Sequence, residues 1–313
     1  MRLTTVCFLS TLSLLNYTPF LRENANRFEQ QQTDLRTLIV TVTDKNNAPI
    51  DKLEAASFTI TFKKISQEVV EVSQTDTPLS VGIVFDLSGS MGSRQGRASK
   101  LMREALNALK SFVHLSHPEN EYFVVGFSDK ALVLSDSSQN AEATMSDLNA
   151  MSNRTFKGGS ALYDGIHLAV NTLSLGKHAK RVILLVTNGQ DNKSHATFKQ
   201  TARLLEKTDI LVYPVNIASD ESAGSALALE GRSILEDFAS LSGGRYVQPK
   251  YNLELSSLLS HVAAELRSQY LVRFRQAATV KNGCFEFKVK VTGTVVSQRK
   301  ALNSRVRKIV CDG

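Results

Sequence analysis

The sequence predicts an α/β fold with a doubly wound, mostly parallel sheet and a small β-rich accessory region built from the N- and C-terminal segments. Between 78 and 268, continuous apolar runs of strand length alternate with segments whose apolar residues recur at helical spacing. Such alternation implies βαβ units, with parallel strands and helices on both faces of the sheet. The segments 36–77 and 269–313 instead carry short strand-like runs separated by turn signals.

The N-terminus has the pattern of an export leader. Arg2 precedes an apolar run over 3–15, which is too short for a comfortable membrane span. We expect 1–22 to be a signal peptide, with no transmembrane anchor, and the protein to be periplasmic or secreted. No pair of small residues marks a cleavage site, so a buried helix or strand is the alternative. The polar, Gln- and Asn-rich stretch 23–35 is expected to be a flexible spacer.

Residues 36–77 are predicted to form a small β module. The run 37–43 is β-branched, 58–62 alternates with period two, and 68–72 is a weaker third strand. A turn cluster at 44–49 separates the first two.

The elements of the central region, 78–268, follow from the same patterns. Apolar runs predict strands at 80–85, 122–127, 131–134, 181–187, 210–217 and 246–247. Helical spacing predicts helices at 98–113, 161–173, 197–207, 232–241 and 253–266.

The tail, 269–313, is predicted to return to strands and to pack on the 36–77 module. Strand signals cover 270–275, 285–291, 295–296 and 305–310. From 270 to 313 the chain has ten basic residues against two acidic ones, which accounts for its net charge of +7. We interpret these as a solvated strand face. Contact with an anionic polymer is the alternative, but the aromatic pattern of nucleic-acid stacking is lacking, so no nucleic acid is expected.

Removal of the leader would leave two of the three cysteines, Cys284 and Cys311. In an oxidising compartment such a pair usually forms a disulfide. Two unpaired thiols are the alternative if the chain is not exported.

Polar residues lie at the ends of three of the predicted core segments, after two strands and before one helix. Asp86, Ser88 and Ser90 alternate directly after the strand 80–85. Ser160 follows a glycine pair at the start of a helix, and Asn188 follows the strand 181–187. Because open α/β folds bind ligands at the carboxyl ends of their strands, we expect these loops to form one site. Hard oxygen donors with a single charge suit Mg²⁺ better than Zn²⁺.

These motifs resemble the von Willebrand factor type A domain and its metal-ion-dependent adhesion site (MIDAS). The resemblance covers roughly 78–268 and rests on Asp-x-Ser-x-Ser at 86–90 and Gly-Gly-Ser-Ala-Leu-Tyr-Asp at 158–164. It implies a Rossmann-like domain. The wider layout is similar to exported type A proteins often met in acidobacteria.

The resemblance implies a role for each site residue. Ser88 and Ser90 would bind Mg²⁺ or Mn²⁺ directly, Ser160 would take the place of a threonine, and Asp86 would act through water. The family's third-loop aspartate falls on Asn188, which removes one negative charge and should weaken metal binding. Asp164 and Asp191 are candidates for residues that surround and support the direct ligands of the ion.

Other chemistries find little support. Neither Ser88 nor Ser160 lies in a Gly-x-Ser-x-Gly elbow, and the six histidines show no paired spacing. No phosphate-binding Gly-x-x-x-x-Gly-Lys motif occurs. We therefore expect a non-enzymatic protein-binding module for adhesion or envelope assembly, whose Mg²⁺ is completed by a partner's acidic side chain. The alternative is a metal-independent interaction protein with a degenerate site. No signal for an oligomeric state is visible.

Overall fold

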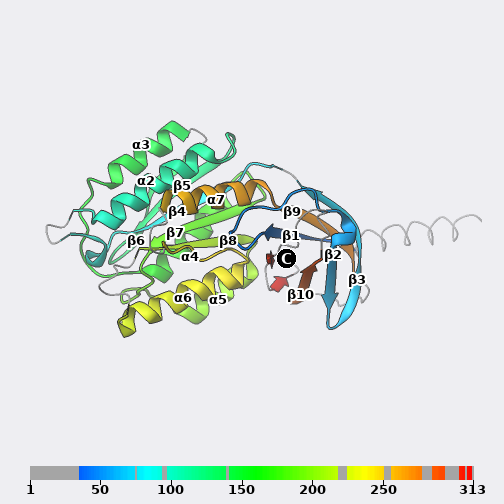
Figure 1. Cartoon of the computed structure of the whole chain (residues 1–313). Helices are drawn as coiled ribbons and strands as arrows, with labels where there is room; N and C mark the ends of the chain where they lie inside the picture. The colour runs from blue at the N-terminus through cyan, green and yellow to red at the C-terminus, as the bar shows by residue number, and fades with distance from the viewer. Residues whose placement is uncertain are drawn as a thin grey trace, which may run out of the picture.

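The computed structural model describes residues 35–74, 76–93, 97–138, 141–217, 224–249, 255–276, 284–292, 303–306 and 309–311. The described residues form a five-stranded and a seven-stranded sheet. Figure 1 shows an α/β part on the left and the second sheet on the right. The predicted leader and all but the last residue of the predicted spacer lie outside the described residues.

The five-stranded sheet has the order β6-β5-β4-β7-β8. Its strands are β4 (Ser80–Asp86), β5 (Glu121–Phe127), β6 (Ala131–Ser138), β7 (Arg181–Thr187) and β8 (Ile210–Asn216). The pairs β4–β5, β4–β7 and β7–β8 are parallel, and only the edge strand β6 is antiparallel. Every residue of β4 and β5 is buried, as expected for strands covered on both faces. The predicted α/β sheet is confirmed.

Helices cover both faces of this sheet (Figure 1). One face packs against α2 (Lys100–Leu115), α3 (Ala141–Met151) and α7 (Leu255–Arg267). The other packs against α4 (Leu162–Ser174), α5 (Phe198–Lys207) and α6 (Ala226–Ser242). Among the described helices, none combines the length and apolar character that crossing a bilayer requires.

Helix α3 is absent from the sequence-based expectations. Its fully buried residues are Thr144, Leu148 and Met151, Met145 is partly buried beside them, and the other residues are small or polar. The apolar stripe is too thin to produce a clear helical period. The other core helices lie close to their expected positions, although α6 starts several residues earlier than predicted.

The seven-stranded sheet interleaves strands from both ends of the chain, in the order β11-β1-β9-β3-β2-β10-β12. The strands are β1 (Leu35–Thr43), β2 (Phe58–Phe62), β3 (Ile65–Gln74), β9 (Tyr270–Arg275), β10 (Cys284–Val291), β11 (Asn303–Val306) and β12 (Ile309–Cys311). Strand β9 pairs with both β1 and β3. The predicted β-rich accessory region from both terminal segments is therefore present. The strand expected at 295–296 lies outside the described residues.

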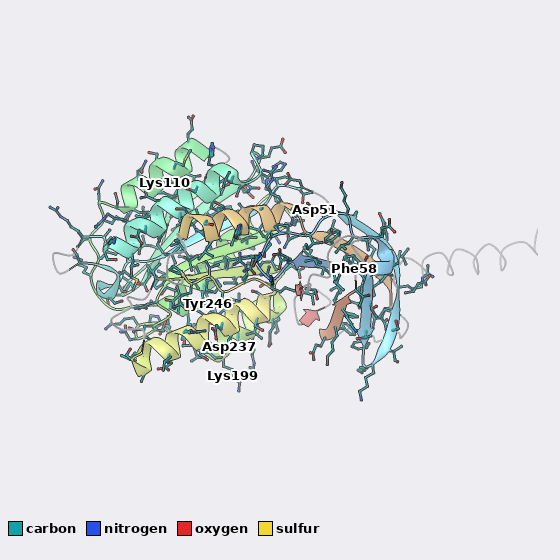
Figure 2. All side chains as sticks on the ribbon, viewed as in Figure 1. Asp51, Phe58, Lys110, Lys199, Asp237 and Tyr246 are labelled. Atoms are coloured by element: carbon teal, nitrogen blue, oxygen red, sulfur yellow. The ribbon has the colours of Figure 1, made fainter. Side chains whose placement is uncertain are left out.

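An aromatic core holds the accessory sheet together. The ring of Phe58, labelled in Figure 2, lies 5.3 Å from that of Tyr270, and the Phe274 ring lies 4.9 Å from that of Phe287. Tyr270 also donates a hydrogen bond to the Ile50 carbonyl at 2.7 Å. The contact between Phe58 of β2 and Tyr270 of β9 joins strands from opposite ends of the chain.

A buried cluster around Glu265 joins the accessory sheet to the α/β part. Its carboxylate, on α7, is fully buried and accepts a hydrogen bond from the Tyr213 hydroxyl at 2.6 Å. Arg305 of β11 lies 2.7 Å from one carboxylate oxygen, and Arg245 lies 3.1 Å from the other. One α7 carboxylate thus connects β8 and β11.

Candidate metal-ion site

Asp86 lies at the centre of the candidate site. It is the last residue of β4, with an exposed fraction of 0%. Its Oδ1 accepts the backbone N–H of Ser88 at 2.9 Å, and its Oδ2 accepts the hydroxyl of Thr187 at 2.7 Å. The buried strand therefore ends by aiming one carboxylate into the loops that follow.

Burial and the neighbouring hydroxyl groups shift the pKa of the Asp86 carboxyl in opposite directions. Burial raises the pKa of Asp86, and the neighbouring hydroxyl groups of Ser88, Thr187 and Ser160 partly offset the rise. Hydroxyls from the first two predicted loops and from the end of β7 therefore lie close to Asp86. Among the described residues, no lysine, arginine or histidine forms an ion pair with it. A buried charge without a counter-charge is costly, so a cation would suit this position.

Ser88 and Ser90 present adjacent oxygen atoms beside Asp86. Their Oγ atoms lie 3.1 Å apart across the short 3-10 turn η2 (Gly89–Met91). Octahedral Mg²⁺ with ligands at about 2.1 Å places neighbouring ligands about 3.0 Å apart. Ser88 is 2% exposed, whereas Ser90 is open to solvent. The spacing of the two hydroxyls fits neighbouring positions around such an ion, with access from outside.

The second loop is held by side chains from its neighbours. The N–H of Gly159 donates to Asp129 Oδ1 at 2.8 Å, and the N–H of Ser160 donates to Asn192 Oδ1 at 2.9 Å. The Ser160 hydroxyl donates to the Gln190 carbonyl at 2.7 Å, which leaves its lone pairs available as a ligand. This loop has to be built around Gly158, because its φ is +80° and a Cβ there would meet the Asp129 carboxylate.

Asn188 turns its amide nitrogen toward the serines. Its Nδ2 lies 3.3 Å from Ser90 Oγ, and its Oδ1 accepts the N–H of Gln190 at 3.2 Å. Exchanging the two amide atoms would set the Nδ2 group against the Gln190 N–H, donor against donor. The loop backbone therefore favours an orientation that presents N–H donors where a metal needs an oxygen. An aspartate here would satisfy both neighbours.

Asp164 and Asp191 support the loops around the site. Asp191 accepts hydrogen bonds from the N–H groups of Tyr163 and Ser194. Asp164 accepts from the N–H groups of His195 and Ala196 at 3.0 and 2.9 Å. Both carboxylates bind the start of α4 to the loop that precedes α5.

Five sequence-predicted residues lie within a continuous set of contacts. Asp86 contacts Ser88 and Ser160, Ser88 contacts Ser90, and Ser90 contacts Asn188. The prediction missed Thr187, although a hydroxyl at the end of an apolar strand was a visible signal. Among the described residues, no group of three or more His, Cys, Asp or Glu side chains could hold a metal ion. The candidate site depends instead on hydroxyl oxygens around one carboxylate.

Residues 81–190 match the sequence model of the von Willebrand factor type A domain family. The chain therefore contains a von Willebrand factor type A domain, a class of domain generally used for interactions between proteins. The match includes the Asp-x-Ser-x-Ser loop, the glycine-serine loop and Asn188.

The similarity of this chain to individual known proteins is low. An uncharacterised protein of Borreliella burgdorferi is 26% identical over 140 residues, which are 44% of this chain and 40% of that curated relative's length. A von Willebrand factor type A structure from Catenulispora acidiphila is 12% identical with a TM-score of 0.49, and covers 89% of this chain and 72% of its own. Proximal thread matrix protein 1 of the mussel byssus, with a zinc-occupied MIDAS motif, is 18% identical with a TM-score of 0.47, and covers 67% of this chain and 50% of its own. Likeness at this level says nothing about a metal or partner of this chain.

Proposed function

We propose that this chain is a protein-binding module whose type A domain holds Mg²⁺ or Mn²⁺ and captures an acidic side chain of a partner. Ser88, Ser90 and Ser160 would hold the ion, with Asp86 as the nearest negative charge. The observation that carries the proposal is the buried Asp86 carboxylate, which lacks a cationic partner among the described residues and lies beside two serine hydroxyls 3.1 Å apart.

The chain's own residues prepare the site in distinct ways. Asp86 holds the Ser88 backbone, while Thr187 donates a hydrogen bond to the other carboxylate oxygen. Ser90, exposed at the rim, leaves the site open to a large partner. When bound, the ion would supply an electrophilic position whose water a carboxylate can replace. Three neutral hydroxyls and one carboxylate would leave one of the ion's two positive charges unbalanced, which favours an anionic guest.

Asn188 favours a second candidate function, a metal-independent interaction module. Its Nδ2 faces Ser90 and its Oδ1 is held by the Gln190 N–H. In this version the amide and the serine hydroxyls would bind a partner by hydrogen bonds alone. The two candidates differ in whether a divalent cation is required.

Titration calorimetry with Mg²⁺ and Mn²⁺ separates them. The first candidate predicts saturable binding to the full chain, a loss of at least tenfold in affinity for Ser88→Ala, and no change for Ser174→Ala on the surface of α4. Flat traces for the unaltered chain at millimolar Mn²⁺ would reject the first candidate in favour of the second.

A synthetic peptide with one aspartate tests the expected partner chemistry. Its binding should require Mg²⁺, disappear with EDTA, and fail when the aspartate is replaced by asparagine. Equal binding of both peptides in the presence of EDTA would contradict capture through the ion.

Export, adhesion and envelope assembly belong to the same proposal and rest on the leader pattern in 1–22. N-terminal sequencing of the protein recovered from a secreting bacterial host tests it. A mature chain beginning near residue 23 is expected, whereas an intact Met1 in the cytoplasmic fraction would contradict export.

A further inference from the structure

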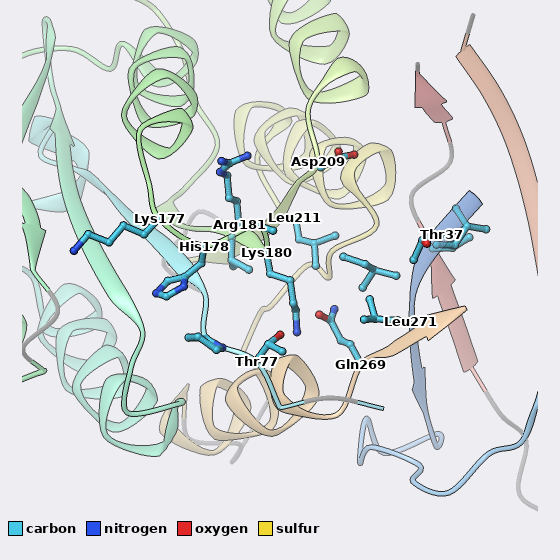
Figure 3. A pocket seen from close by; sticks show the side chains of 16 residues that line it. Thr37, Thr77, Lys177, His178, Lys180, Arg181, Asp209, Leu211, Gln269 and Leu271 are labelled. Atoms are coloured by element: carbon cyan, nitrogen blue, oxygen red, sulfur yellow. The ribbon is translucent and has the colours of Figure 1, made fainter. Parts of the chain in front are cut away.

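A cavity of about 550 Å³ lies between the two sheets (Figure 3). It is at the end of the parallel strands opposite the candidate metal site. Strand β7 runs between the two sites, because Arg181 at its start lines the cavity and Thr187 at its end contacts Asp86. Seven strand residues separate them by about 20 Å. Small-molecule sites often lie at such domain junctions and have volumes in this range.

The cavity wall is largely apolar and comes from both parts of the chain. Its apolar lining residues are Leu38 and Ile39 of β1, Pro78, Ala179, Val182 of β7, Leu211 of β8, Leu271 of β9 and Val306 of β11. Of the polar residues that line the cavity, Lys180 and Gln269 direct their side chains into this space, from the α/β part and from the segment before β9 (Figure 3). An apolar chain with a polar head would match this distribution.

Lys180 supplies the cation. Its Nζ donates to the Leu266 carbonyl at 3.0 Å, and among the described residues it forms no ion pair. The nearby Asp76 pairs instead with Arg267 at 2.6 Å. Burial lowers the pKa of Lys180 to about 8, against an opposing effect of Asp76, so the amine is still mainly charged at pH 7. A partly buried ammonium with one neutral acceptor is suited to an anionic ligand.

Gln269 supplies an unpaired acceptor. Its side chain is 2% exposed, and its Nε2 donates to Thr41 Oγ1 at 3.0 Å. Within the described part of the chain its Oε1 is buried without a hydrogen-bond partner. Buried acceptors are nearly always satisfied, so a ligand that brings a hydroxyl would complete this group.

We propose that the cavity binds a hydroxylated, medium-chain carboxylic acid. Its carboxylate would pair with Lys180, its hydroxyl would donate to Gln269 Oε1, and its alkyl chain would cover the apolar wall. Because the ligand would touch β1, β8 and β9 together, it would also stabilise the junction of the two sheets.

Calorimetry with 3-hydroxydecanoate below its micelle-forming concentration tests this site on the full chain. Two matched ligands isolate each contact: decanoate lacks the hydroxyl, and the methyl ester of 3-hydroxydecanoate lacks the charge. We expect the hydroxy acid to bind at least tenfold more tightly than either, because a site built around hydrogen bonds rejects analogues that leave its groups unpaired.

Substitutions at Lys180 and Gln269 test which side chain contacts which group of the ligand. Lys180→Met should weaken binding of the hydroxy acid tenfold or more, whereas Lys180→Arg should keep it within a few-fold. Gln269→Leu should bring the affinities of the hydroxy acid and decanoate together. Lys199→Met, on the outer surface of α5 (Figure 2), is the control and should change neither.

Equal binding of the acid and its methyl ester, or unchanged binding in Lys180→Met, would overturn the proposal, since both indicate non-specific adsorption. Absence of any heat at millimolar ligand would overturn it as well. Ser88→Ala and EDTA should leave binding unchanged, so failure here and failure of the metal site are distinguishable.

Discussion

The hydroxyl of Thr187 donates to Asp86 Oδ2 at 2.7 Å, joining the carboxyl ends of the neighbouring parallel strands β4 and β7. The same Thr187 oxygen accepts the N–H of Gly189 at 3.1 Å. One hydroxyl therefore supports both the buried carboxylate and the start of the third loop.

Thr187→Val should remove both contacts with little change in volume. Because it leaves a buried carboxylate oxygen and an N–H unpaired, we expect a loss of about 1–3 kcal/mol in the free energy of unfolding, measured with urea. Thr201→Val is the matched control, since that buried hydroxyl donates to the neutral Thr197 carbonyl. A loss at Thr187 no larger than at Thr201 would contradict a special role for the carboxylate contact.

Asn188→Asp should strengthen Mg²⁺ binding about tenfold or more. The new carboxylate would accept the Gln190 N–H with one oxygen and offer the other beside Ser90, and charge count tunes such sites. Calorimetry measures the gain. Asn107→Asp on α2 adds the same charge away from the site and should have little effect on Mg²⁺ affinity. Similar gains in affinity from both variants would show that net charge, and not the position of the carboxylate, causes the gain.

Glu265→Gln should destabilise the whole chain. The substitution leaves the partly buried Arg245 and Arg305 without their counter-charge, and breaking a buried pair in this way costs about 3–5 kcal/mol. The exposed pair of Glu236 with Arg232 provides the control, because Glu236→Gln should cost less than about 1 kcal/mol. Comparable urea midpoints for the two variants would show that the cluster does not stabilise the junction.

The stability difference between the unaltered chain and Lys180→Met should depend on pH. Since burial lowers the pKa of Lys180 from 10.5 to about 8, the unfolded chain binds more protons than the folded chain between these values. The stability of the unaltered chain should therefore rise relative to Lys180→Met from pH 8 to 10.5, and the difference should be constant below pH 8. Urea unfolding across this range is the measurement, and a difference independent of pH would argue that the amine is hydrated in the folded state.

Cys284 and Cys311 lie opposite each other in the antiparallel register of β10 and β12. Their side chains lie outside what the structure describes, so the disulfide stays a prediction. Directly opposed residues on antiparallel strands have Cα separations within the range that a disulfide spans. Loss of the bond should cost about 3–4 kcal/mol. Non-reducing electrophoresis and unfolding of Cys311→Ser test it, and unchanged mobility and stability would indicate free thiols.

Much of the fold could be predicted, because the core strands are continuous apolar runs in the sequence. The run 80–85 is apolar throughout and is buried on both faces as β4. Other features depend on distant partners. The strand β3 is far longer than its predicted core because pairing with β9, not local pattern, sets its length. Helix α3 escaped prediction because only three of its side chains are buried.

The site was predictable in its members but not in its hydrogen bonds. Asp86, Ser88 and Ser90 stand in one motif, so their proximity follows from the sequence. The orientation of Asn188 does not, because it depends on the N–H of Gln190 and therefore on the path of the loop. The cavity around Lys180 was also beyond prediction, since its wall combines strands from both ends of the chain.

The most direct test of the central claim is anomalous diffraction from crystals of the full chain grown with Mn²⁺. The account predicts an anomalous peak about 2.1–2.3 Å from the Oγ atoms of Ser88 and Ser90, next to Asp86. Crystals at saturating Mn²⁺ with no peak at these serines, or with a peak only elsewhere on the surface, would contradict it.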